Sequence, residues 1–290
     1  MRPGVVGLSL SRFAFDETLR LVREIGGECI ELCTVPGAHR GTLDLSPSNR
    51  LRVKEMVGEA GLQISAVAGY NDFSFSDRAR LRDEVKRLRG YMELAASLGC
   101  PLVRAFGGDL RPNVEREDVI DSIVRGFRES VKWANEYNIR LALENHRRLV
   151  NHAPSIARIV EEVGSERLRV TLDTGNFRWA GYSLKEVRRF LSMLVPYTVN
   201  VHLKDGVLGK DGTMQFLPLG EGELDIAGII AALRRAGYSG PLCSEFEGAG
   251  DPKGVLGPDG TVVRDPAAEA LIREGTRKSL AYLHTLLSGA

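Results

Sequence analysis

Short apolar runs alternate with longer amphipathic segments along the whole chain. Most of the runs are nearly continuously apolar and rich in β-branched residues, which is typical of parallel strands covered on both faces. The segments between them show helical spacing, as Ile120, Ile123 and Phe127 do after Asp118. Eight strands are predicted in this way: Val5–Leu8, Cys29–Leu32, Gln63–Val67, Leu102–Phe106, Leu141–Glu144, Arg169–Asp173, Val199–Leu203 and Leu242–Phe246.

Polar residues and glycines indicate where the predicted helices begin and end. Gly99 and Gly237 stand where a helix C-terminus favours glycine. Eight strands that alternate with helices, about 30 residues per unit, predict a single-domain (β/α)8 TIM barrel over residues 1–290. An open doubly wound sheet is the alternative, but no GxGxxG motif follows the first strand. The expected helix N-caps are Asp16, Asp77, Ser183 and Asp225.

Two long segments, residues 206–222 and 248–266, interrupt the regular alternation of predicted strands and helices. The first contains Asp211-Gly212 between short apolar runs, which predicts a hairpin turn. Both follow predicted strands at the C-terminal face, where TIM barrels carry their active sites. We expect residues 248–266, rich in Gly, Pro and Asp, to order over a bound substrate and exclude water.

The composition narrows the function classes. Hydrophobic residues make up 43% and charged residues 27% of the 290, the balance of an ordinary globular protein. The 39 basic and 38 acidic residues leave a net charge of +1, so nucleic acid and anionic membranes are not expected partners. Without a signal-peptide pattern or a transmembrane-length apolar run, we expect a cytoplasmic protein. The four cysteines form no CxxC pair and are expected to be buried and reduced: Cys29, Cys33, Cys100 and Cys243.

The last four predicted strands each end close to an acidic residue or a histidine. These residues are Glu144, Asp173, His202 and Glu245. Neighbouring strands lie about 4.8 Å apart and a barrel wall curves, so four consecutive strand ends can converge inside the mouth. Three clustered carboxylates repel one another, and a divalent cation relieves that repulsion. Three carboxylates and one imidazole suit one Mn²⁺, Mg²⁺ or Co²⁺ ion, with Zn²⁺ as a further option.

The same strand ends carry a family resemblance. The runs LENH at 143–146, LDTGN at 172–176 and HLKD at 202–205, with the more specific LPLGEGELD at 217–225, resemble the sugar phosphate isomerase/epimerase superfamily of xylose isomerase-like TIM barrels. This resemblance implies the same four metal ligands. Many epimerases of the family carry histidine three residues after the strand-six aspartate, where this chain has Asn176.

Further polar residues are candidates for contacts to substrate. His146 and Lys204 share side-chain parity with Glu144 and His202, so each could reach substrate hydroxyls or simply lie at the solvated rim. Asn176 is the third substrate-binding candidate. Glu247 shares parity with Glu245 and is the rival metal ligand of the eighth strand.

A candidate buried pair of charged residues and a glycine-rich turn can each be interpreted as structural features and not as parts of the active site. Glu31 and Arg104 lie within predicted strands and could form a buried ion pair if both face inward. The Gly220–Gly222 turn could cradle a phosphate at the following helix N-terminus. Glycines that serve the turn, with Asp225 as the helix cap, are the simpler interpretation.

The preferred functional hypothesis is a metal-dependent enzyme that moves a proton next to the carbonyl of a sugar or keto-polyol. Glu144 and Glu245 would be the acid–base pair, acting through an enediolate in an isomerase or epimerase. The alternative is a dehydratase of the keto-inositol or dehydroshikimate type. Less favoured are an endonuclease IV-like enzyme, since only five histidines are present, and a non-catalytic sugar-binding barrel. A homo-oligomer is compatible with the sequence.

Overall fold

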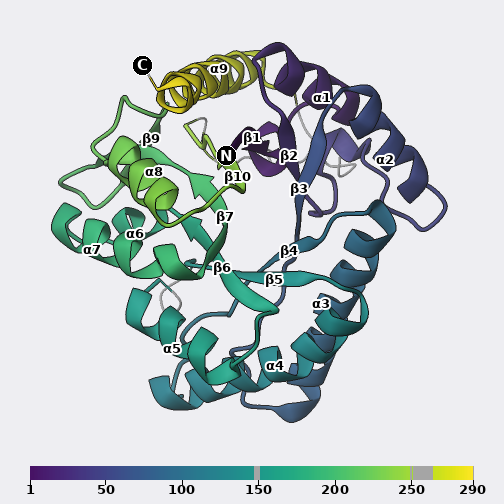
Figure 1. Cartoon of the computed structure of the whole chain (residues 1–290), viewed down its shortest axis with the longest axis vertical. Helices are drawn as coiled ribbons and strands as arrows, with labels where there is room; N and C mark the ends of the chain where they lie inside the picture. The colour runs from purple at the N-terminus through teal and green to yellow at the C-terminus, as the bar shows by residue number, and fades with distance from the viewer. Residues whose placement is uncertain (147–150, 249, 251–263, 290) are drawn as a thin grey trace. The chain divides into compact units, whose positions relative to one another are not determined.

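The computed structural model describes residues 1–146, 151–248, 250 and 264–289. Its strands close a barrel in the order β1-β10-β7-β6-β5-β4-β3-β2 (Figure 1). This confirms the predicted fold class. The barrel strands are β1 Arg2–Val6, β2 Cys29–Leu32, β3 Gln63–Ala68, β4 Leu102–Ala105, β5 Arg140–Glu144, β6 Leu168–Asp173, β7 Thr198–Leu203 and β10 Pro241–Ser244.

Helices follow the strands, as the sequence pattern predicts. A short antiparallel hairpin of β8 (Asp205–Leu208) and β9 (Met214–Leu217) stands apart from the barrel sheet. Within the described residues, three 3-10 helices occupy connections: η1 Gly7–Leu10, η2 Ala38–Gly41 and η3 Val195–Tyr197. The α-helices are α1 Phe15–Glu24, α2 Arg50–Glu59, α3 Arg78–Leu98, α4 Arg116–Glu136, α5 Ala153–Val163, α6 Asn176–Trp179, α7 Leu184–Leu194, α8 Ile226–Arg235 and α9 Pro266–Ser288.

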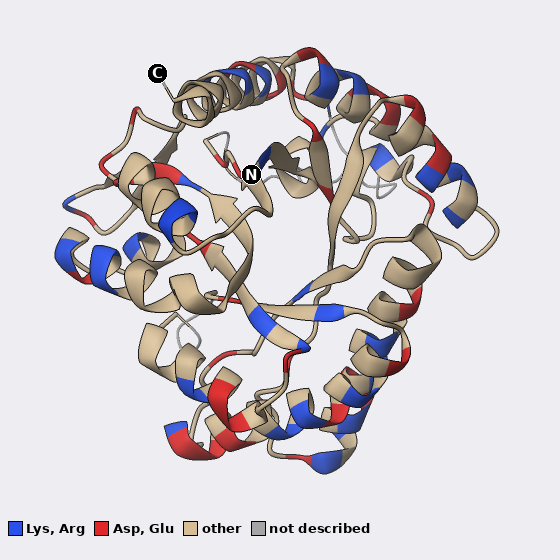
Figure 2. Ribbon diagram, viewed as in Figure 1, with Lys and Arg blue, Asp and Glu red and all other residues tan. Residues whose placement is uncertain are grey.

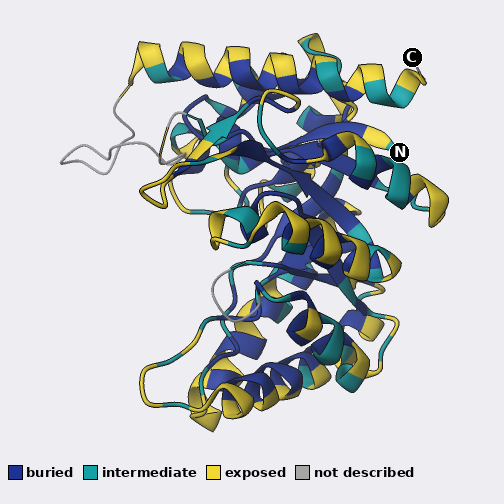
Figure 3. Ribbon diagram, turned by 90° about the vertical axis from the view of Figure 1, so that its left-hand side faces the viewer, coloured by how far each residue is buried: buried dark blue, intermediate teal, exposed yellow. Residues whose placement is uncertain are grey.

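The first of two compact units comprises residues 1–65, 202–230 and 239–290. Within it, β1 pairs in parallel with both β10 and β2. Helix α9 lies against β1 and β10 and buries Ile272, Leu280 and Leu283, while its opposite face is exposed along its length (Figure 3). A one-sided apolar stripe of this kind is what holds an outer helix on a barrel strand.

The second unit comprises residues 66–201 and 231–238. In it, β4 pairs with β5 and β5 with β6, and α3, α4 and α5 lie side by side outside these strands (Figure 1). Phe73 and Phe127 pack edge to face at 5.0 Å in the buried layer. Residues of both charge signs are interspersed along α3 and α4 (Figure 2).

The first strand lies earlier than the pattern predicts, at Arg2–Val6 instead of Val5–Leu8. The chain leaves the sheet at Gly7 and enters η1. The strand begins earlier because Gly4 has no side chain and fits between two cysteines: it registers with Cys29 on one side and Cys243 on the other. A Cβ at Gly4 would meet the Sγ of Cys29 and lie 2.6 Å from its carbonyl oxygen.

The predicted helix ends are mostly confirmed. Asp16 is wrong as an N-cap, since α1 begins after Ala14, whose N–H donates to Oε2 of Glu17 at 3.0 Å. Asp16 lies inside the first turn, where its carboxylate pairs with Arg20. A glutamate that reaches back to the preceding backbone replaces the expected cap. The confirmed N-caps and C-terminal glycines are Asp77, Ser183, Asp225, Gly99 and Gly237.

The structure tests the prediction for the first of the two long segments but not the prediction for the second. The predicted hairpin is confirmed: β8 and β9 pair around a turn in which Gly212 has φ 81°. Most of the 248–266 segment, with its expected closure over substrate, lies outside the described residues. None of the described helices combines the length and apolar character needed to cross a membrane.

Candidate metal centre

Four buried side chains offer ligand atoms within 4.8 Å of one another: Glu144, Asp173, His202 and Glu245. They stand at or next to the ends of β5, β6, β7 and β10, the four strands on which the sequence placed the candidate ligands. Glu245, and not its rival Glu247, is the glutamate of this cluster. The set offers three carboxylates and one imidazole, a donor set that fits a divalent cation.

Glu144 closes β5 and is held by two neighbours. Its Oε2 lies 3.3 Å from Nε of Arg104, a buried residue of β4. Its Oε1 accepts a hydrogen bond of 3.1 Å from Nδ2 of Asn176. Arg104 is itself fixed, because its Nη1 donates to the carbonyl of Gly69 and its guanidinium lies 4.2 Å from the ring centre of Phe106.

Asp173 closes β6 and is fully buried. Its Oδ1 accepts from the backbone N–H groups of Gly175 and Asn176, both at 2.9 Å, where α6 begins. Asn145 bonds the backbone of Asp173 twice: Nδ2 donates to its carbonyl at 2.9 Å, and Oδ1 accepts from its N–H at 2.8 Å. Because Asn145 directly follows Glu144, this side chain locks the ends of β5 and β6 to each other.

His202 lies in β7 with both ring nitrogens next to carboxylates. Nε2 is 2.8 Å from Oε2 of Glu31 in β2, and Nδ1 is 3.2 Å from Oε2 of Glu245. Glu245 lies one residue beyond β10 and stays in place because its N–H donates to the carbonyl of Leu203 at 2.9 Å. Nζ of Lys204 is 3.3 Å from the same Glu245 oxygen and 3.4 Å from Oε1 of Glu247.

The backbone N–H groups of the glycine-rich turn after β9 already bind a carboxylate of the same chain. Asp205 accepts four backbone hydrogen bonds of 2.8–3.2 Å, from Gly206, Gly220, Gly222 and Leu224. Burial raises the pKa of Asp205, and the four N–H donors oppose that shift. Since Gly220 and Gly222 direct their N–H groups at this carboxylate, the glycines serve the turn and not a phosphate cradle, as the simpler interpretation held.

The substrate-binding candidates have distinct surroundings. The ring of His146 lies tilted against Phe106 and Trp179, with ring centres 4.7 Å and 5.9 Å apart, in a cluster of aromatic rings after β4 to β6. Asn176 contacts Glu144, and Lys204 contacts Glu245. The sequence alone gave no role to Asn145, Asp205 or this aromatic cluster; the position of Asn145 directly after Glu144 was the one local signal for it.

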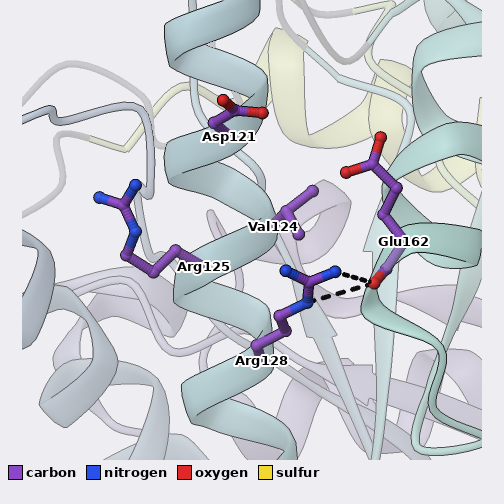
Figure 4. Close-up of a pocket in the computed structure, with 5 residues that line it drawn as sticks. All are labelled: Asp121, Val124, Arg125, Arg128 and Glu162. Atoms are coloured by element: carbon purple, nitrogen blue, oxygen red, sulfur yellow. Dashed lines mark hydrogen bonds between the residues drawn. The ribbon is translucent and has the colours of Figure 1, made fainter.

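A separate pocket of about 280 Å³ lies between α4 and α5 (Figure 4). Asp121, Val124, Arg125, Arg128 and Glu162 line it. The Nε of Arg128 donates to the backbone carbonyl of Glu162 at 3.2 Å, near the end of α5. A cation at a helix C-terminus is a common structural stabiliser, so this pocket needs no ligand to explain it.

A family model described as the xylose isomerase-like TIM barrel matches residues 19–277. The chain belongs to this family. L-ribulose-5-phosphate 3-epimerase UlaE of Salmonella paratyphi C is 25% identical to it over 237 residues, covering 79% of this chain and 81% of the relative. The counterpart from Salmonella typhi is 24% identical over the same shares.

Solved structures share the family fold along the whole chain. The IolI protein with a bound zinc atom has a TM-score of 0.77 at 18% identity, covering 99% of this chain and 98% of that one. D-psicose 3-epimerase in the presence of D-fructose has a TM-score of 0.73 at 20% identity, with full coverage of both chains. A family member from Mycobacterium smegmatis in complex with magnesium has a TM-score of 0.69 at 19% identity, with 97% coverage of each.

Proposed function

We propose that this protein is a divalent-metal-dependent epimerase or isomerase of a ketose or keto-polyol. The observation that carries the proposal is the buried set of three carboxylates and one imidazole within 4.8 Å. The similarity to L-ribulose-5-phosphate 3-epimerase along 79% of the chain supports a small sugar substrate and stereochemical inversion beside a carbonyl.

One metal ion would be held by Glu144, Asp173, His202 and Glu245. Asp173 would bind through Oδ2, because its Oδ1 faces two backbone N–H groups. His202 would bind through Nδ1, because its Nε2 faces Glu31. When bound, the ion supplies Lewis acidity that polarises the substrate carbonyl and acidifies the adjacent C–H bond. The oxygen-rich donor set favours Mn²⁺, Mg²⁺ or Co²⁺, with Zn²⁺ also compatible.

Glu144 and Glu245 would transfer the proton. Each carboxylate lies 3.3 Å from a cationic side chain, Arg104 for Glu144 and Lys204 for Glu245. A neighbouring positive charge favours the ionised form in whichever of the two glutamates acts as the base. One glutamate, ionised, would remove the proton beside the carbonyl and keep it. The other, protonated beforehand by solvent, would deliver its own proton to the opposite face in an epimerase or to the neighbouring carbon in an isomerase, and both would then exchange protons with solvent.

Three polar residues would orient the substrate. Lys204 is buried beside Glu245 and could donate to a substrate oxygen. His146 presents an imidazole at the edge of the aromatic cluster, where it could contact a hydroxyl. Asn176 would act partly through Glu144, since its amide donates to the Oε1 of that residue.

The test is a panel of ketoses, keto-polyols and their phosphate esters, incubated with metal-loaded protein in D₂O and followed by NMR. We expect deuterium at the carbon next to the carbonyl, together with an epimer or an aldose. Deuterium incorporation followed by loss of water would instead assign a dehydratase. No exchange from any substrate with Mn²⁺, Mg²⁺, Co²⁺ or Zn²⁺ would contradict the proposal.

Glutamine variants test the proton-transfer pair. Glu144→Gln and Glu245→Gln should each lower turnover by about 10²–10⁴-fold, the usual contribution of a general acid or base. Glu247→Gln is the matched control, because Glu247 contacts the same lysine but lies outside the ligand cluster. Near-normal turnover of Glu245→Gln with a large loss in Glu247→Gln would transfer the role to Glu247.

A further inference from the structure

Glu31 is a buried charge that needs an explanation. It lies in β2, where every residue from Cys29 to Leu32 is buried, and its own side chain is 0% exposed. A carboxylate is almost never buried without a partner that offsets its desolvation. Its position beside β1 is fixed by the register of Val6 with Glu31.

Glu31 lies against the imidazole of His202. Oε2 of Glu31 lies 2.8 Å from Nε2 of a histidine that is itself 1% exposed. An ionised carboxylate can only accept hydrogen bonds, so the Nε2 that faces it carries a proton. In the neutral imidazole the lone pair is then on Nδ1.

Nδ1 is the nitrogen on the side of the proposed metal ligands. It lies 3.2 Å from Oε2 of Glu245, whereas Nε2 points to Glu31. A ring with the opposite tautomer would direct a lone pair at the carboxylate of Glu31 and a proton at the metal position. A ring turned over would lose the 2.8 Å hydrogen bond. Glu31 therefore selects both the tautomer and the orientation that metal binding requires.

We propose that Glu31 is a positioning residue of the metal centre, which holds His202 as an Nδ1 ligand through a carboxylate–histidine hydrogen bond. The inference rests on the metal site of the proposed function. An outer carboxylate of this kind also raises the basicity of the imidazole, and its loss typically weakens metal binding by about 10–100-fold.

The experiment compares metal affinity by titration calorimetry, with Mn²⁺ and with Zn²⁺, for the wild type and two variants. Glu31→Gln keeps the size of the side chain and one acceptor oxygen, so we expect about a 10-fold weaker affinity. Glu31→Ala removes the acceptor, so we expect a loss of up to about 100-fold. Turnover of Glu31→Gln should recover in excess metal, since the four ligands are intact. A purely structural role would not give that recovery.

The matched control is Glu269→Gln. Glu269 is another buried glutamate, on α9, but its carboxylate pairs with Arg264 at 2.7 Å and is not part of the ligand cluster. We expect its metal affinity to equal that of the wild type. A second readout is the ¹H–¹⁵N spectrum of the zinc-loaded wild type, in which the Nε2–H of His202 should give a solvent-protected signal, assigned by its absence in His202→Asn.

The outcomes separate the two proposals. If the wild type binds no divalent ion, the metal site of the proposed function is wrong. If the wild type binds metal and folded Glu31→Gln and Glu31→Ala bind it equally well, Glu31 has no positioning role. If Glu31→Ala does not fold, Glu31→Gln and the protected Nε2–H signal decide: unchanged affinity or a signal from Nδ1–H instead would overturn the inference.

Discussion

The carboxylate of Asp205 provides a quantitative test of how the turn before α8 is held. Its Oδ1 accepts from Gly206 and Leu224 at 2.8 and 3.1 Å, and its Oδ2 accepts from Gly220 and Gly222 at 3.0 and 3.2 Å. We expect Asp205→Ala to remove all four acceptor contacts and to lower the free energy of unfolding.

The magnitude depends on which N–H groups water can reach. Gly206 and Leu224 are buried, whereas Gly220 is exposed and Gly222 is half-buried, so water replaces the carboxylate at the last two. A buried donor without an acceptor costs about 1–3 kcal/mol, so the two buried ones cost about 2–6 kcal/mol. Burial raises the pKa of Asp205, so the substitution also removes a desolvation cost, and the lower end of about 2 kcal/mol is expected.

The assay is urea-induced unfolding at pH 7, followed by tryptophan fluorescence. Asp211→Ala is the control, because Asp211 accepts a backbone hydrogen bond of 3.0 Å from Thr213 at an exposed turn. That variant should stay within about 0.5 kcal/mol of the wild type, the usual range of a surface substitution. If Asp205→Ala falls in the same range, the turn is held by other contacts and the reasoning is refuted.

Three further predictions concern stability. Gly4→Ala should cost about 1–3 kcal/mol in chemical unfolding, because the new Cβ meets Cys29 Sγ in a packed sheet; an unchanged midpoint would show that β1 can shift. Metal at 100 times its dissociation constant should stabilise the fold by about 2.7 kcal/mol and raise Tm in calorimetry, and equal Tm values with and without chelator would contradict a site formed only on folding. Burial lowers the pKa of His39 from 6.5 to about 4. Between these pH values the unfolded chain binds a proton on His39 that the folded chain does not bind. The free energy of unfolding should therefore fall by up to about 3 kcal/mol as the pH drops from 6.5 to 4. His39→Asn, which tolerates the φ of 54° there, should lack this pH dependence.

The parts of the fold that depend on local sequence were predictable. Except for β1, which lies earlier at Arg2–Val6, strand positions follow from apolar runs. The caps at Asp77 and Ser183 follow from a side chain that reaches three residues along the chain. The error at Asp16 has the same local origin, because two acidic residues compete for the first turn of α1 and Glu17 makes the backbone contact.

The candidate ligands were predictable because consecutive strands of a parallel barrel are neighbours, so residues at their C-terminal ends lie close together. Each of the four stands at or near the end of a strand, and the structure brings their ligand atoms within 4.8 Å. The contacts around them were not predictable from spacing. Glu31 and His202 are 171 residues apart, and their contact depends on side-chain direction in two buried strands. No periodicity in one sequence encodes which of several inward-facing groups an acidic side chain will meet.

The glycine between two thiols in the wall of the barrel gives the protein a built-in chemical reporter. Cys29 and Cys243 flank Gly4 on either side, and both are buried. A thiol reagent can reach them only after β1 separates from a neighbouring strand, so the labelling rate at low reagent concentration measures how often this part of the sheet opens. In the closed sheet, the hydrogen bond between the two thiols lowers the pKa of Cys29 and raises that of Cys243. The rate of local opening can thus be measured on the wild-type sequence, without introducing a new cysteine.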